Sequence, residues 1–320
     1  MPSKCFSFTA TKNRCLKSSF SSRGLRSTFT DLKDGTIMHC WVPKSRKTTR
    51  PDLILIHGFG ANSMWQWADT VRILSTHFNV YVPDLVFFGD SFTTRPERTE
   101  SFQAECVKRV MEANSVTKMS VVGLSYGGFV AYAMAAQFRD CIEKVVICCA
   151  GVCLEEKDLK EGLFAVSSVE DAANILLPQT AEKMRELMGY TFVKAPAKVL
   201  PSCLLTDFID EMFTQYVEEK KELLLAIAKD RKLSDLPKIT QPTLIVWGDQ
   251  DKIFPLELGH RLKRFISPTG QIGENAQLVV IKNAGHAFLY EKPKDFHKPL
   301  KSFLLGSTKS PPPNNPQDQT

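Results

Sequence analysis

The sequence has no apolar run long enough to cross a membrane. Its longest apolar stretch, Val145 to Leu154, is only about half of the roughly 20 residues that a spanning helix requires. With 43% hydrophobic and 24% charged residues among 320, the chain has the composition of a globular protein that folds around its own core. This composition excludes collagen-like, coiled-coil and wholly disordered chains.

Cysteine pairs at metal-binding or redox spacing are also missing. The chain has nine cysteines, and none belongs to a CxxC pair. Cys148 and Cys149 stand side by side within an apolar run, where neighbouring thiols of a buried strand act as small hydrophobic side chains. We therefore expect free thiols in a reducing compartment, the cytoplasm, and no metal site. We expect no organic cofactor either.

The first thirty residues contain no acidic side chain. They hold all of the net charge of +6, which leaves residues 31–320 formally neutral. One interpretation is a short helix near Thr9–Phe20, ended by Gly24 and packed with its basic side in water. The other is a Ser-rich transit peptide that directs the chain to a plastid or mitochondrion. No basic patch interleaved with aromatic residues follows, so we expect no nucleic-acid partner.

Strand-like and helix-like segments alternate through most of the remaining chain. This rhythm predicts an α/β fold with a mostly parallel central sheet flanked by helices. The expected strands are Thr36–Val42, Leu53–His57, Asn79–Pro83, Met119–Leu124, Ile142–Ala150, Thr243–Trp247 and Gln277–Ile281. The expected helices are Trp65–His77, Ser101–Ala113, Gly127–Phe138 and Lys292–Leu305.

The alternation stops between residues 153 and 238. This stretch has no convincing strand but several helical runs, the longest being Thr206–Lys229 as one amphipathic helix. We expect a helical cap inserted after the sixth strand, between core segments 31–152 and 239–305. Residues 306–320 are rich in proline, and we expect a disordered tail there.

One motif carries chemistry, Gly123-Leu124-Ser125-Tyr126-Gly127, directly after an apolar strand and before a helix. A nucleophilic serine in this context stands on a sharp, strained turn, and the two glycines leave room for that turn. Ser125 is therefore the candidate nucleophile.

A serine nucleophile needs a base and a carboxylate that orients the base. His286 follows the strand Gln277–Ile281 and is the candidate base, since the other histidines lie in less suitable settings. Asp249 and Asp251 both follow the strand Thr243–Trp247. Their position leaves either one able to orient the histidine.

Two backbone N–H groups are also required to bind the oxyanion of the tetrahedral intermediate. One is expected from Tyr126, the residue after the nucleophile, and the other from Phe59 in the loop that begins at His57. The ring of Phe59 is a candidate to line the substrate pocket. His57 itself is expected to bind the loop and not to act as a base.

Together these motifs make the chain similar to the α/β-hydrolase family over roughly residues 31–305. The matching landmarks are HGFG at 57–60, PDL at 83–85, GLSYGG at 123–128, GDQDKIFP at 248–255 and NAGH at 283–286. The family's acid-loop pattern, G-x-x-D-x-(I/V)-x-P, matches Gly248, Asp251, Ile253 and Pro255, and this favours Asp251 over Asp249. The chain resembles plant members related to monoacylglycerol lipases and to carbon–carbon bond hydrolases.

The resemblance implies a serine hydrolase that cleaves a small-molecule ester or lipid-like substrate with Ser125, His286 and Asp251. Serine at the elbow argues against epoxide hydrolases and haloalkane dehalogenases, which carry aspartate there. Ala287 after the histidine replaces the tryptophan that carbon–carbon hydrolases often have, and residues 84–91 depart from the usual D-x-x-G-H-G-x-S pattern. Two alternatives are hydrolysis of a carbon–carbon bond in a diketone-like acid, and a small-molecule receptor with residual hydrolase activity. The sequence leaves the oligomeric state open.

Overall fold

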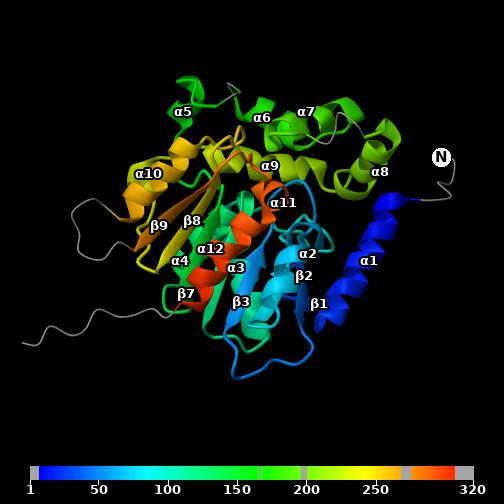
Figure 1. Cartoon of the computed structure of the whole chain (residues 1–320), viewed down its shortest axis with the longest axis vertical. Coiled ribbons are helices and arrows are strands. Elements are labelled where there is room, and N and C mark those ends of the chain that lie inside the picture. Colours follow the sequence, from blue (N-terminus) through cyan, green and yellow to red (C-terminus); the bar gives the residue numbers. More distant parts are fainter. Residues whose placement is uncertain (1–6, 165, 167, 196–199, 268–274, 307–320) are drawn as a thin grey trace, which may run out of the picture.

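The protein is built on a nine-stranded sheet that runs through its centre. The computed structural model describes residues 7–164, 166, 168–195, 200–267 and 275–306 (Figure 1). The strands are β1 (Leu25–Asp31), β2 (Thr36–Pro43), β3 (Asp52–Ile56), β4 (Asn79–Pro83), β5 (Phe92–Thr93), β6 (Met119–Leu124), β7 (Ile142–Cys148), β8 (Thr243–Gly248) and β9 (Ala276–Ile281).

Six of these strands form the parallel part of the sheet. Their order is β4-β3-β6-β7-β8-β9, and every neighbouring pair in this series is parallel. Beyond β4, the strands β2 and β1 extend the sheet in antiparallel pairing. The two-residue β5 pairs with β2 off the main path. Strands β3, β4, β6 and β8 are buried along their whole length, as expected for a sheet covered on both faces. The predicted mostly parallel sheet is confirmed.

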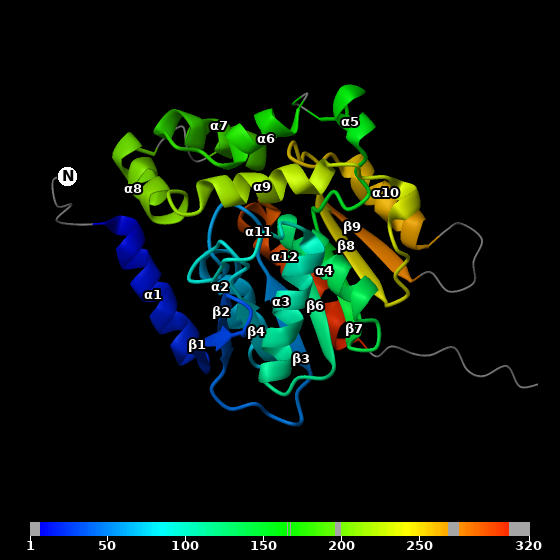
Figure 2. The ribbon, with the colours of Figure 1, turned by 180° about the vertical axis from the view of Figure 1, so that it is seen from behind.

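Helices cover both faces of the sheet. Helices α2 and α12 lie on one face, joined by a hydrogen bond of 3.0 Å between Thr70 and His297, and α3 and α4 lie on the other (Figures 1 and 2). The helices outside the long insertion are α1 (Phe8–Ser22), α2 (Ser63–Leu74), α3 (Glu100–Ala113), α4 (Tyr126–Gln137), α10 (Leu256–Ile266), α11 (Phe288–Glu291) and α12 (Pro293–Leu305). The short β5, α10 and α11 were not anticipated from the sequence.

Five α-helices of the described residues lie between β7 and β8. Strand β7 is the expected strand Ile142–Ala150, so the insertion begins where it was predicted. It is the sixth strand when the unexpected β1 is counted and β5, which lies off the main path, is not. Figures 1 and 2 show these helices gathered at the end of the sheet where β8 leads into the loop before α10. They are α5 (Glu156–Lys160), α6 (Val169–Leu176), α7 (Ala181–Thr191), α8 (Ser202–Met212) and α9 (Val217–Ala228), followed by a 3₁₀ turn at Leu233–Asp235.

The prediction of one helix over Thr206–Lys229 is wrong, because α8 ends at Met212 and α9 begins at Val217. Tyr216, between them, has a φ of 54°, in the left-handed region that a continuous helix excludes. The carbonyl of Phe213 accepts a hydrogen bond of 3.2 Å from the side chain of Gln179, a residue of a distant segment. Tertiary contacts therefore replace the helical hydrogen bonds at this point.

The basic N-terminal segment folds onto the protein. The short helix expected near Thr9–Phe20 is α1, in which Thr9, Leu16 and Phe20 are buried. The segment also supplies β1, which pairs with β2 over its whole length. The core expected to begin at residue 31 therefore leaves out this edge strand of the sheet. The tail beyond residue 306 lies outside the described residues. Among those described, no helix combines the length and apolarity needed to cross a bilayer.

Asp84 and Lys220 are among the ionisable side chains that are buried in the described part of the chain. Burial opposes ionisation of Asp84, but hydrogen bonds from His39 (2.7 Å) and the Ser63 N–H (3.0 Å) outweigh it and hold the pKa of Asp84 below its ordinary value. Lys220 on α9 is 4% exposed, and its ammonium lies 5.1 Å from the centre of the Phe88 ring. Burial lowers the pKa of Lys220 to about 8.

Candidate active site

Ser125 occupies a sharp turn between β6 and α4. Its backbone has φ 54° and ψ −121°, a conformation that costs free energy in any residue except glycine. A side chain at Gly123 would overlap the carbonyl of Gly127, and one at Gly127 would overlap the carbonyl of Ile56. The turn therefore forms only with glycine on both sides, and it projects the hydroxyl of Ser125 above the end of the sheet.

Three predicted residues form one hydrogen-bonded chain. The Oγ of Ser125 lies 2.9 Å from Nε2 of His286, and Nδ1 of His286 lies 2.8 Å from Oδ2 of Asp251. The side chain of Asp251 is fully buried and that of His286 is 11% exposed, so the pair is largely shielded from water. Residues that are far apart in the sequence meet here because β6, β8 and β9 end at the same edge of the sheet.

The carboxylate of Asp251 is fixed by backbone groups. Its Oδ1 accepts hydrogen bonds from the N–H groups of Ile253 (2.8 Å) and Phe254 (2.9 Å), which leaves Oδ2 directed at His286. The competing Asp249 accepts from the N–H of Ala284 at 3.3 Å and so holds the loop that carries the histidine. The structure brings Asp251, and not Asp249, into contact with the imidazole.

The loop at Gly58 and Phe59 packs directly against the serine turn. A Cβ at Gly58 would lie 2.7 Å from the carbonyl oxygen of Leu124 and 2.8 Å from Cβ of Ser125, so only glycine allows this approach. The rings of Phe59 and Tyr126 meet edge to face with centroids 5.1 Å apart. The two residues predicted to donate their N–H groups therefore lie beside each other and beside Ser125.

Gln66 on α2 holds this loop and was missed in the sequence. Its Oε1 accepts from the N–H of Gly58 at 2.8 Å, and its Nε2 donates to the carbonyls of Phe59 (2.8 Å) and Gly58 (3.2 Å). The N–H of Gly58 is thus already used by Gln66, which agrees with Phe59 as the donor expected from this loop. The signal that the sequence offered was a glutamine placed between two tryptophans, Trp65 and Trp67.

His57 has the structural role that the sequence suggests. The N–H of Leu85 donates to its Nε2 at 2.9 Å, which makes Nδ1 the protonated nitrogen, and Nδ1 donates to the carbonyl of Gly58 at 2.8 Å. Burial lowers the pKa of His57, so the ring stays neutral and binds the loop.

Cys149 lies beside the imidazole of His286. Its Sγ is 4.0 Å from Nε2, and the carboxylate of Asp251 completes a trio of potential metal ligands within 4.8 Å of one another in the described part of the chain. Burial raises the pKa of the Cys149 thiol well above its ordinary value, so the sulfur is an uncharged, poor metal ligand. His286 and Asp251 are already bonded to each other, and the arrangement suits proton transfer better than metal binding.

Ser125 and His286 open into a cavity of about 500 Å³, called here the Ser125 cavity. Its wall is mainly apolar and combines residues of the sheet loops with residues of the inserted helices. Phe59 lines it, as predicted, and so do Phe192, Phe208 and Phe213. Tyr216 does not line it but packs against Phe87, with ring centroids 5.6 Å apart. Further wall residues are Trp65, Met184, Leu187, Leu205 and Leu289.

The Ser125 cavity also reaches a part of the chain that the sequence placed outside the site. Phe8 and Thr9, at the start of α1, belong to its wall. No sequence motif marked them, because they lie in the basic segment that was interpreted as a surface helix or a transit peptide.

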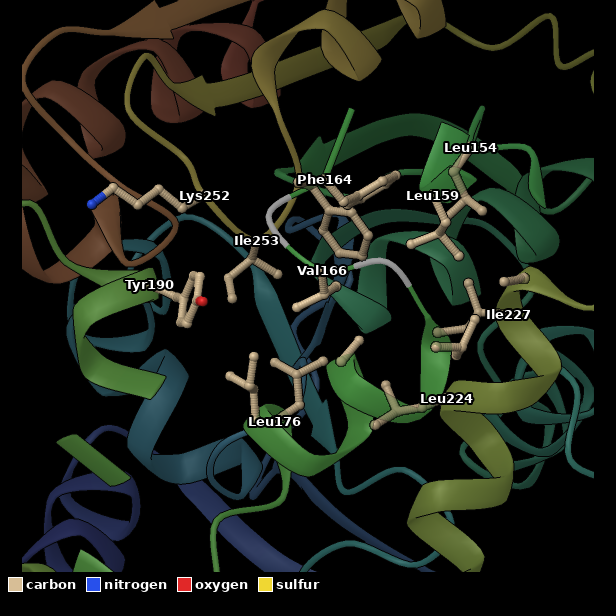
Figure 3. Close-up of a pocket in the computed structure, with 15 residues that line it drawn as sticks. Leu154, Leu159, Phe164, Val166, Leu176, Tyr190, Leu224, Ile227, Lys252 and Ile253 are labelled. Carbon is tan, nitrogen blue, oxygen red and sulfur yellow. The ribbon is translucent and has the colours of Figure 1, made fainter. Parts of the chain in front are cut away.

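A smaller cavity, of about 80 Å³, lies on the other side of the acid loop. Figure 3 shows it between Ile253, Leu176 and Leu224, with the amine of Lys252 directed away from it. Its wall contains neither Ser125 nor His286, and Leu176 is common to both cavities. The chemistry is therefore confined to the larger cavity.

Comparison with known proteins agrees with this architecture. The sequence pattern described as the alpha/beta hydrolase family matches residues 53–298. The chain is 26% identical over 283 residues to the mouse (Mus musculus) monoacylglycerol lipase ABHD6, covering 83% of this chain and 79% of that protein. It is 28% identical over 269 residues to 2-hydroxy-6-oxo-2,4-heptadienoate hydrolase of Pseudomonas putida, covering 79% of this chain and 88% of that protein. In fold it is similar to the solved lip1 protein of Acinetobacter baumannii AYE, with a TM-score of 0.77 and 24% identity over 92% of this chain and 95% of that one.

Proposed function

Because the chain belongs to the alpha/beta hydrolase family, we propose that it is a serine hydrolase that cleaves carboxylic esters with apolar, lipid-like acyl groups. The observation that carries this proposal is the hydrogen-bonded chain of Ser125, His286 and Asp251 at the floor of an apolar cavity. The mouse relative named monoacylglycerol lipase gives further support.

In the proposed mechanism, Ser125 attacks the ester carbonyl while Nε2 of His286 accepts the proton of its hydroxyl. Asp251 holds the proton on Nδ1, so that Nε2 is the free base, and it stabilises the imidazolium that forms. The N–H groups of Phe59 and Tyr126 bind the oxyanion, and losing one such donor costs about 3 kcal/mol in the barrier. His286 then protonates the leaving alcohol, and water cleaves the acyl-enzyme. This sequence needs no cofactor.

The inserted helices complete the proposed site as a cap over residues 153–238. Met184 and Leu187 on α7 and Leu205 on α8 cover the end of the sheet that carries Ser125. A cap of this kind excludes water from the acyl-enzyme and supplies most of the apolar surface for the acyl chain.

A second candidate reaction is hydrolysis of a carbon–carbon bond in a diketone-like acid, which the Pseudomonas putida relative supports. Such an acid carries a carboxylate that requires a cationic or hydrogen-bonding partner when it is buried. Among the described residues that line the Ser125 cavity, none is lysine or arginine. These wall residues offer a carboxylate some hydrogen-bonding side chains but no cation, and an uncharged ester suits them better. A third candidate, a small-molecule receptor of the same fold, predicts slow turnover at the same serine.

For the compartment, we propose the cytoplasm. The eight cysteines of the described residues are free thiols, which suits a reducing environment.

The decisive experiment is labelling with a fluorophosphonate probe, followed by kinetics on a panel of esters with acyl chains of increasing length. We expect wild type to be labelled and Ser125→Ala to remain unlabelled, with the matched variant Ser101→Ala, on the exposed start of α3, labelled like wild type. Equal labelling of wild type and Ser125→Ala refutes the nucleophile. Labelling without turnover of any ester favours the receptor.

A further inference from the structure

Helix α1 closes one side of the Ser125 cavity. Phe8 and Thr9 contribute to the wall of the cavity, and Figure 1 shows α1 beside α2 and α8. The helix begins at a cap in which the Oγ of Ser7 accepts from the N–H of Ala10 at 3.0 Å. The side chains that enter the wall are thus in the first turn of a well-formed helix.

Two hydrogen bonds connect α1 to both halves of the site. The N–H of Thr9 donates to Oδ2 of Asp207 on α8 over 2.8 Å, and this contact is buried. The Nε1 of Trp65 on α2 donates to Oδ1 of Asn13 over 2.5 Å. Trp65 and Phe208 in turn meet edge to face, with ring centroids 5.2 Å apart. Helix α1 therefore bridges the gap between the core and the inserted helices.

The rest of the helix is anchored to the sheet. Leu16 and Phe20 are buried, and Phe20 packs edge to face on Trp41 of β2 with centroids 5.2 Å apart. The carboxylate of Asp207 lies at the N-terminal end of α1, where the helix dipole favours a negative charge. Packing along the helix and a charged contact at its start both hold the first turn against the cavity.

Phe8 is the residue best placed to limit what the cavity admits. Its side chain lines the cavity, yet the residue is 54% exposed, so the ring lies between the interior and the solvent. A ring in this position obstructs substrates that extend past the wall but leaves shorter ones untouched.

We propose that α1 is the outer wall of the Ser125 cavity and that Phe8 determines the length and bulk of the ester that the protein accepts. This inference rests on the proposed esterase function. It assigns the basic N-terminal segment a part in substrate selection, because removal of residues 1–30 would remove this wall together with β1.

The test compares the ratio of kcat/KM for a dodecanoyl and a butanoyl p-nitrophenyl ester in wild type, Phe8→Ala and Phe8→Trp. We expect Phe8→Ala to raise the ratio by roughly three- to ten-fold and Phe8→Trp to lower it. The effect is smaller than in an enclosed pocket because Phe8 is 54% exposed. Phe29→Ala is the matched control, since Phe29 is 61% exposed on β1 and does not line the cavity. Phe8→Leu gives the same comparison if Phe8→Ala fails to fold.

The outcomes separate the two proposals. Unchanged ratios in Phe8→Ala and Phe8→Trp, with normal turnover, overturn the proposal that Phe8 limits the substrate. They leave the proposed esterase function standing. Absence of ester turnover in wild type overturns the esterase. In that case the affinity of Ser125→Ala for an uncharged fluorescent long-chain ester is measured with and without Phe8→Ala. Equal affinities overturn the proposal that Phe8 forms the wall.

Discussion

The replacement Asp251→Asn tests the proposed triad most sharply, because the structure fixes how the new side chain must lie. Oδ1 of Asp251 accepts two backbone N–H groups, from Ile253 and Phe254. The amide oxygen of asparagine has to take this position, since an NH₂ group there would face two donors. Its NH₂ group is then directed at Nδ1 of His286.

An NH₂ group can only donate, so Nδ1 of His286 must accept, and the imidazole proton moves to Nε2. Nε2 then cannot take the proton of Ser125, which lies 2.9 Å away. In a serine protease the equivalent change costs about 10⁴-fold in kcat, close to 5.5 kcal/mol of activation free energy. We expect a loss of this size with KM little changed, because the cavity wall is untouched.

The assay is steady-state hydrolysis of a p-nitrophenyl ester, with Asp249→Asn as the matched control. Asp249 lies in the same loop but hydrogen-bonds the N–H of Ala284, so its variant should stay within about three-fold of wild type. Both variants should unfold at similar temperatures. Wild-type rates in Asp251→Asn together with an inactive Asp249→Asn would show that the other acid orients the histidine.

Three further predictions concern residues that support the site or the core. Gln66→Ala should lower kcat about ten-fold with little change in KM, because the Phe59 loop loses its anchor, and an unchanged kcat contradicts that role. The pKa of Asp84 lies below its ordinary value of 3.8, so Asp84 adds stability above that pH and loses it as the pH falls through the folded-state pKa. Urea unfolding at pH 7 and pH 3 should therefore show a smaller difference for Asp84→Asn than for wild type. The pKa of Lys220, about 8, lies below its ordinary value of 10.5, so between these values the unfolded chain binds more protons and stability rises with pH. Lys220→Met should unfold at a higher temperature than wild type at pH 7, and the difference should shrink by pH 10.

The sequence was most informative where the local pattern alone determines the structure. The runs that became β3, β4, β6 and β8 are mostly apolar, because a strand covered on both faces leaves few positions for a polar side chain. The turn at Ser125 was recognisable for the same reason, since Gly123 and Gly127 are required by contacts of the turn with its immediate surroundings.

It was least informative where distant segments decide the outcome. Strand β1 has mostly exposed positions and becomes a strand only through its pairing with β2. The break between α8 and α9 depends on Gln179, more than thirty residues before it, which bonds the carbonyl of Phe213. Neither feature leaves a signal in a window of neighbouring residues.

The sequence by itself determined the order and chemistry of the site: a serine on a glycine-flanked turn, an acidic loop and a histidine loop, each after a strand. The order of the residues left Asp249 and Asp251 open, and only the resemblance to the family favoured Asp251. The tertiary structure shows Asp251 facing the imidazole and Asp249 bonded to the backbone of Ala284. It also placed Phe8 and Thr9 in the Ser125 cavity. The wall of a pocket is determined by which surfaces pack together in space. Residues separated by more than a hundred positions carry no local sequence pattern that predicts their contact.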